Sequence, residues 1–112
     1  MEGKKTNNLF NLDPIQSSGQ EVFESILKTR DLTIERIVTS KPYDNPGDWY
    51  DQENDEWVLL IQGEASLEFS NNEVITLIPG DYILIPAHKK HRVKRSSEEP
   101  KCIWLAIHGK LK

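Results

Sequence analysis

The sequence has only one cysteine, Cys102, so an internal disulfide is excluded. A chain without disulfides suits a reducing compartment, and we expect a cytoplasmic protein. Because Cys102 opens an apolar run, it is predicted to be a small buried or half-buried hydrophobe. No apolar stretch follows Lys4 and Lys5, and none elsewhere approaches the length of a membrane span. We therefore expect neither a signal peptide nor a contact with the membrane.

The chain also lacks an excess of positive charge. Its 112 residues carry 14 Lys and Arg against 18 Asp and Glu, which gives a formal net charge of -4. The basic cluster at residues 89–95 is too short for an extended phosphate-binding surface, so nucleic acid is not an expected partner. We expect a solvated strand end there, and a site for an anionic small ligand is the less favoured alternative. Phosphate-binding glycine loops, nucleophile elbows and paired cysteines are absent too.

The polar residues that are present gather near the N-terminus. Residues 1–19 are rich in Asn, Ser, Pro and Gly and are predicted to form a flexible arm. Apolar residues of this arm, Leu9, Phe10, Leu12 and Ile15, could attach it to the body. Residues 20–112 are predicted to form a single domain, because a chain of this length suits one hydrophobic core.

This domain is predicted to be all-β. Short apolar or alternating segments are separated by turn-prone residues, a spacing typical of a sandwich or barrel. Residues 21–28 could instead form one or two helical turns, since Val22 and Ile26 are four apart, but a strand is favoured. The predicted strands cover residues 21–28, 33–40, 56–62, 64–69, 74–78, 82–85, 91–95 and 102–108.

Three of these strands, at residues 56–62, 82–85 and 103–107, are apolar on both faces. A strand of this kind must be covered on both faces. One face would line the barrel interior. The other would be covered by the N-terminal hairpin, by the arm or by a second copy of the chain, so a homodimer is predicted.

Two spaced motifs resemble those of the cupin superfamily. The first cupin motif contains a glycine, a His-x-His pair, a glutamate and, after six residues, a glycine. The second contains a glycine, then Pro-x-Gly and a histidine. The matching residues here are Glu56, Gly63, Gly80, Pro86 and His91. Over roughly residues 32–108 the chain is identified as a small single-domain cupin of the cupin 2 type. This resemblance implies a double-stranded β-helix, a jelly-roll-like barrel.

The first motif is degenerate, because the His-x-His pair is missing. Counting back from Glu56, its two positions fall on Tyr50 and Gln52 or on Trp49 and Asp51. In the second motif, a histidine at position 88 replaces the glycine of Pro-x-Gly. Metal-binding cupins use three histidines and one glutamate, so the resemblance implies that two of these four ligands remain.

The candidate metal ligands are Glu56, His91, Asp51 and His88. Glu56 and His91 follow from the resemblance, Asp51 could add an oxygen donor, and His88 lies three residues before His91. A simpler interpretation pairs Glu56 with His91 by a charge-assisted hydrogen bond without a metal. It also leaves His88 on the surface. His108 ends the last predicted strand, and no ligand role is expected for it.

Three functions are compatible with these residues. The first is an enzyme that uses a divalent metal, Zn, Mn, Fe or Ni, to act on a small molecule. The second is a metal-free module that binds or senses a small molecule, and the third is a structural homodimer. If Glu56 and His91 share a metal, their polar atoms should lie within about 4 Å of each other inside the barrel.

Overall fold

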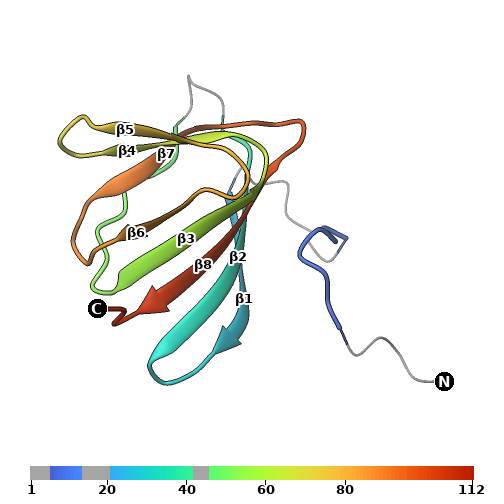
Figure 1. The fold of residues 1–112 in the computed structure, drawn as a ribbon, viewed down its shortest axis with the longest axis horizontal. Coiled ribbons are helices and arrows are strands. Elements are labelled where there is room, and N and C mark those ends of the chain that lie inside the picture. The colour runs from blue at the N-terminus through green and yellow to red at the C-terminus, as the bar shows by residue number, and fades with distance from the viewer. Residues whose placement is uncertain (1–5, 14–20, 42–45) are drawn as a thin grey trace.

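The structure is a computed structural model that describes residues 6–13, 21–41 and 46–112. These residues form eight β-strands and no helix, so the all-β prediction is confirmed (Figure 1). Accordingly, the described part of the chain contains no helix that could cross a membrane. The strands are β1 (Glu21–Lys28), β2 (Leu32–Thr39), β3 (Asp55–Gln62), β4 (Ala65–Phe69), β5 (Val74–Leu77), β6 (Tyr82–Ile85), β7 (His91–Ser96) and β8 (Cys102–Gly109).

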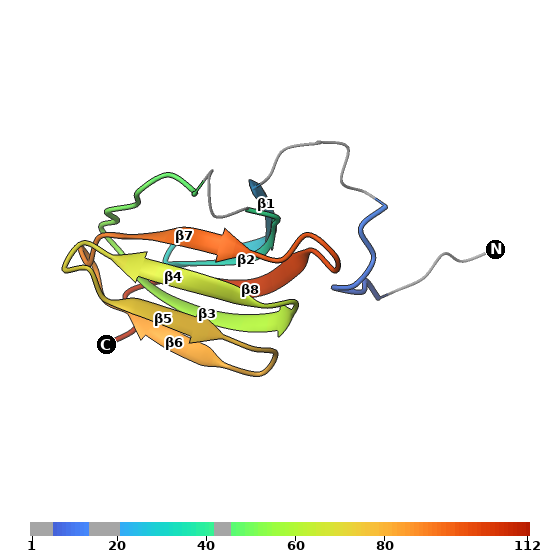
Figure 2. The same cartoon turned by 90° about the horizontal axis from the view of Figure 1, so that it is seen from above.

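The strands form two antiparallel sheets. The five-stranded sheet has the order β1-β2-β8-β3-β6, and the three-stranded sheet has the order β5-β4-β7. In the view from above, β4, β5 and β7 lie in front of β2, β3 and β8, so the two sheets form two layers (Figure 2). This is the jelly-roll-like barrel that the sequence predicts.

The first two strands form the predicted hairpin. β1 pairs with β2 from Glu21, opposite Thr39, to Lys28, opposite Thr33, so the alternative helical turns do not form. Thr29 closes the turn, because its hydroxyl oxygen accepts hydrogen bonds from the backbone N–H groups of Asp31 and Leu32.

The core lies between the two sheets. Strand register fixes which side chains enter it: Glu56 lies opposite His108, and Trp104 lies opposite Ile37, so these four residues share the inner face. The buried hydrophobic cluster consists of Ile37, Val58, Leu60, Ala65, Leu67, Phe69, Leu77, Ile85, Cys102, Trp104 and Ala106. Cys102 is therefore a buried free thiol, as predicted.

The outer face of the five-stranded sheet is also apolar over β8, β3 and β6. Tyr82 and Leu84 of β6 are 67% and 38% exposed. Trp57 and Leu59 of β3 lie directly opposite Leu84 and Tyr82, and both are half-buried. Leu105 of β8 lies opposite Leu59 and extends the same surface. The strands predicted to be apolar on both faces thus form one continuous apolar surface.

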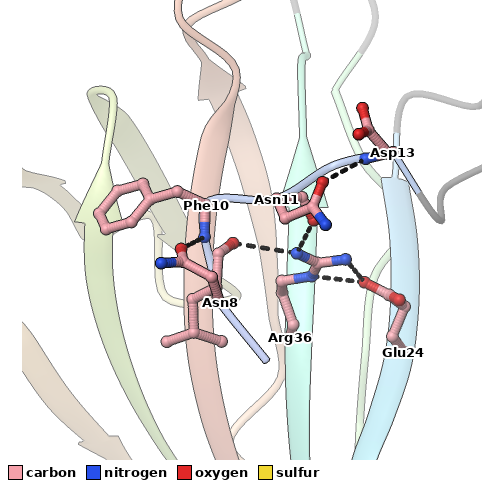
Figure 3. Close-up of polar contacts among 7 residues, drawn as sticks. Asn8, Phe10, Asn11, Asp13, Glu24 and Arg36 are labelled. Carbon is pink, nitrogen blue, oxygen red and sulfur yellow. Dashed lines mark hydrogen bonds and ion pairs between the residues drawn. The ribbon is translucent and has the colours of Figure 1, made fainter. Parts of the chain in front are cut away.

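The described part of the arm, residues 6–13, is attached to this sheet at Arg36 of β2. The Arg36 guanidinium pairs with Glu24 of β1 and donates hydrogen bonds to the carbonyl oxygens of Leu9 and Asn11 (Figure 3). Leu9 and Leu12 are half-buried, whereas Phe10 is exposed. Ile15 and the predicted boundary at residues 19–20 lie outside the described residues, so the division into arm and domain stays a prediction.

Candidate functional site

A pocket of about 280 Å³ opens between the two sheets. This volume lies near the lower end of the roughly 300–1,000 Å³ typical of small-molecule sites. Its wall is mainly apolar and aromatic and also carries three glutamates and two histidines. The lining residues are Glu21, Phe23, Glu35, Ile37, Thr39, Tyr50, Gln52, Glu56, Val58, Leu67, Ile85, His91, Val93, Trp104 and His108.

One side of the pocket comes from the loop before β3. The backbone N–H of Tyr50 donates to the carbonyl of His91 at 2.8 Å, and the N–H of His91 donates to the carbonyl of Tyr50 at 3.0 Å. This bridge fixes which side chains face inward. Tyr50 and Gln52 line the pocket, while Trp49 and Asp51 do not. The two positions of the missing His-x-His pair that face the pocket are therefore Tyr50 and Gln52.

Glu56 and His91 meet in the pocket wall. His91 Nε2 lies 3.2 Å from Glu56 Oε1, and both side chains are less than a tenth exposed. His91 Nδ1 lies 2.9 Å from the carbonyl oxygen of Lys89. Because a carbonyl can only accept, Nδ1 must carry a proton. The separation of Glu56 and His91 is within the predicted limit of about 4 Å.

The balance of forces favours the charged form of His91. Burial, the largest influence, acts to lower the pKa of His91. The hydrogen bond to Glu56, the Lys89 carbonyl and the negative charge of Glu56 together outweigh it, so the pKa of His91 is raised above its ordinary value. A protonated His91 ring can donate one hydrogen bond to the Lys89 carbonyl and another to the Glu56 carboxylate.

His108 lies next to the Glu56-His91 pair, although no ligand role was expected for it from the sequence. Its Nε2 lies 3.6 Å from Glu56 Oε2 and 2.7 Å from Glu35 Oε1, which joins His91, Glu56, His108 and Glu35 in one chain of side chains. The 2.7 Å contact with Glu35 is within ion-pair distance, and Nε2 itself is buried and forms no hydrogen bond. The sequence signal for this position was alternation, since Trp104, Ala106 and His108 share one face of β8.

The other two candidate ligands lie elsewhere. Asp51 and His88 pair with each other at 2.9 Å, but their side chains are 55% and 66% exposed and neither lines the pocket. Asp51 points away because it lies between two inward-facing residues, Tyr50 and Gln52. His88 lies in the turn before β7 with a φ angle of 64°, in the left-handed region. The structure therefore does not bring Asp51 and His88 to Glu56 and His91.

The donor set falls short of what a metal ion requires. A protein site for a transition metal usually supplies at least three ligands. Among the described residues, no three His, Cys, Asp or Glu side chains are arranged to hold a metal ion. Glu56 and His91 provide two donors, and His108 contacts the far oxygen of Glu56. As these side chains stand, they do not fit a metal centre.

The pocket is electrostatically negative near Tyr50. Burial raises the pKa of Tyr50 to about 12, with further contributions from the charges of Glu21, Asp48 and Glu56. Burial also raises the pKa of Glu21, against the nearby Lys41 ammonium. Tyr50 therefore keeps its phenolic proton and can act as a hydrogen-bond donor.

Two antiparallel sheets around a pocket with a Glu-His pair on its wall define a double-stranded β-helix barrel. The family model described as "Cupin domain" matches residues 37–108 of this chain. The chain therefore belongs to the cupin family, and the resemblance seen in the two motifs is confirmed.

Several known proteins resemble this chain. A protein of Ralstonia eutropha JMP134, with the proposed activity of a mannose-6-phosphate isomerase, is 35% identical; the match covers 96% of this chain and 99% of that one, with a TM-score of 0.79. A cupin superfamily protein of Desulfitobacterium hafniense DCB-2 is 20% identical, with coverages of 96% and 94% and a TM-score of 0.71. The iron(II) form of HppE is 13% identical, with coverages of 78% and 52% and a TM-score of 0.68. The last two likenesses concern the fold alone.

A curated relative matches only a segment. The RCS-specific HTH-type transcriptional activator RclR of Escherichia coli K12 is 40% identical over 47 residues. This match covers 42% of this chain and 16% of RclR, so the shared segment is a small part of that protein.

Proposed function

We propose that this chain is a cupin that binds a small molecule in the pocket between its sheets without a metal. The observation that carries this proposal is the chain of His91, Glu56, His108 and Glu35 on a mainly apolar wall. Apolar pockets with a few convergent polar groups are the usual form of small-molecule sites. The two side chains that the family uses as metal ligands are here hydrogen-bonded to each other.

In this pocket the polar groups would orient the ligand and the apolar wall would supply the area that it buries. His91 is held on one side by the Lys89 carbonyl and on the other by Glu56, so its ring is fixed before a ligand arrives. Tyr50 and Gln52 stand at the positions of the missing histidines and would add hydrogen bonds of their own.

A fragment screen by ligand-observed NMR tests this proposal. We expect fragments to bind the wild type and to lose binding in Val93→Phe, because Val93 lines the pocket and the larger ring would fill it. Val74→Phe is the matched control, since Val74 is 44% exposed on β5. If no fragment binds, or if both variants bind as the wild type does, the proposal is wrong.

A divalent metal is the second candidate, and one contact favours it. A histidine that binds a metal through Nε2 commonly donates its Nδ1 proton to a backbone carbonyl, as His91 does to Lys89. Glu56 and His91 would hold such an ion, and a third ligand would require other side chains to move. Elemental analysis for Zn, Mn, Fe and Ni, with His91→Ala as the control, decides between the two candidates. A stoichiometric metal that His91→Ala loses would replace the metal-free proposal.

We also propose that the chain forms a homodimer through the outer face of its five-stranded sheet. Tyr82, Leu84, Trp57, Leu59 and Leu105 form a continuous apolar surface there, as the strand pairing requires. Patches of this kind mark interaction sites when they are large and contiguous. The cytoplasm remains the proposed location, because the single thiol is free and no internal disulfide is possible.

A further inference from the structure

The pocket wall carries an excess of negative charge. Glu21, Glu35 and Glu56 supply three carboxylates, and the wall contains no lysine or arginine among the described residues. Lys41 Nζ lies 3.8 Å from Glu21 Oε1, but Lys41 is outside the lining. Among the described lining residues, the imidazoles of His91 and His108 are the groups that can offset this negative charge.

These acceptors converge at one end of the pocket. Glu35 Oε1 and Glu56 Oε2 both lie within 3.6 Å of His108 Nε2. That nitrogen is buried and has no hydrogen-bond partner. Both carboxylates keep lone pairs that can accept a hydrogen bond, so Glu35 and Glu56 can present two charged acceptors to one group. An ammonium matches them, because it has N–H donors and a positive charge.

The rest of the pocket suits an apolar body attached to that ammonium. Phe23, Tyr50 and Trp104 place aromatic rings in the wall, and Ile37 and Val58 add aliphatic surface. Aromatic faces attract cations as well as apolar groups. The negative environment near Tyr50, described above, lies in the same cavity.

We propose that the pocket selects a small organic cation, a primary amine on an apolar or aromatic body, and rejects phosphorylated and carboxylated molecules. This inference rests on the proposed function and names its ligand class. A phosphate group would be placed among three carboxylates with no lysine or arginine in the described wall to neutralise it. The ligand class therefore differs from the sugar phosphate in the name of the Ralstonia eutropha relative.

Three probes with the same body test the choice of head group. Benzylamine, benzyl alcohol and benzyl phosphate carry positive, neutral and negative groups on one benzyl ring, and their affinities are measured by isothermal titration calorimetry. We expect benzylamine to bind at least about tenfold more tightly than the alcohol, as a hydrogen bond to a charged partner implies, and benzyl phosphate not to bind.

Glu35→Gln keeps the shape of the side chain and removes its charge. In this variant we expect the affinity for benzylamine to fall roughly tenfold and that for benzyl alcohol to stay nearly unchanged. Glu68→Gln is the matched control, because Glu68 pairs with Arg92 and does not line the pocket. A control that weakens benzylamine as much as Glu35→Gln does would overturn the assignment of the ammonium to Glu35.

The outcomes separate this inference from the proposed function. If benzyl alcohol or benzyl phosphate binds as tightly as benzylamine, and Val93→Phe abolishes that binding, the cation preference is wrong while pocket binding stands. If none of the three binds, the inference is also wrong. The proposed function instead fails when the fragment screen finds no ligand of any charge whose binding Val93→Phe abolishes, or when a stoichiometric metal is found that His91→Ala loses.

Discussion

Residue 88 has a backbone conformation that suits glycine better than histidine. His88 has a φ angle of 64°, in the region where a side chain costs roughly 1–2 kcal/mol. The cupin motif has a glycine at this position. The side chain of His88 does little to offset this cost, because its pair with Asp51 is mostly exposed and such pairs contribute little to stability.

We therefore expect His88→Gly to be about 1 kcal/mol more stable to unfolding than His88→Ala. Both variants lose the contact with Asp51, and only the alanine keeps a Cβ in the left-handed conformation. Urea unfolding of the two variants measures the difference. Equal midpoints would mean that the backbone at residue 88 is not strained.

The Glu56-His91 pair makes stability depend on pH. The pKa of His91 is raised in the folded protein, so the pair's contribution to the unfolding free energy is fully present below the pKa of an unfolded histidine, about 6.5. This stabilisation is lost as the pH rises through the pKa of His91 in the folded protein. We expect the wild type to exceed Glu56→Gln in unfolding free energy by more at about pH 5.5 than at about pH 9.

Urea midpoints at the two pH values measure this effect, and Glu68→Gln is the control. Glu68 pairs with an arginine, Arg92, and not with a histidine, so the difference between Glu68→Gln and the wild type should not follow the same pattern. A Glu56→Gln difference that grows toward alkaline pH would contradict the hydrogen bond to a charged His91.

At the scale of elements, Arg36 joins three segments of the chain. It lies on β2, pairs with Glu24 of β1 and donates to the carbonyls of Leu9 and Asn11 in the arm (Figure 3). The Arg36 side chain is only 7% exposed, so truncating it leaves a partner carboxylate and two carbonyls without their donor.

We expect Arg36→Ala to lower the unfolding free energy by about 2–3 kcal/mol and to release residues 6–13. Hydrogen exchange followed by mass spectrometry should detect faster exchange in those residues. Glu24→Gln, which removes only one partner, should leave the arm attached. Unchanged exchange in Arg36→Ala would mean that the arm is held by its apolar side chains instead.

The strands were largely predictable from the sequence, and the candidate site was predictable only in part. Alternation and turn residues located all eight strands to within a residue or two, as β6 at Tyr82–Ile85 illustrates. Glu56 and His91 were located because they belong to two spaced motifs. The orientation of Asp51 was not predictable, because it depends on the backbone bridge between Tyr50 and His91. His108 was missed because its partner Glu56 depends on the register of β3 and β8.

For the whole molecule, the apolar outer face makes association the central prediction. We expect the wild type to sediment as a dimer at low micromolar concentration and Leu84→Lys to sediment as a monomer. Leu84 is 38% exposed in the single chain and lies on β6, the edge strand that carries part of the patch, opposite Trp57 of β3. A charge there would be buried without a partner in the dimer.

Val74→Lys is the control for this experiment, since Val74 is 44% exposed on the other sheet. It should leave the sedimentation of the protein unchanged. A wild type that sediments as a monomer at this concentration would refute the dimer.

The side chains of Tyr50 and Gln52 enter the pocket from a loop, while the strands carry Glu56 and His91. Replacing both loop residues with histidine would restore the first cupin motif without altering any strand, since the bridge to His91 is made by the backbone. We expect the double variant Tyr50→His/Gln52→His to bind Zn or Ni, measured by elemental analysis and a higher melting temperature with added metal. Two substitutions in one loop would then be enough to convert a metal-free binding barrel into a metal centre.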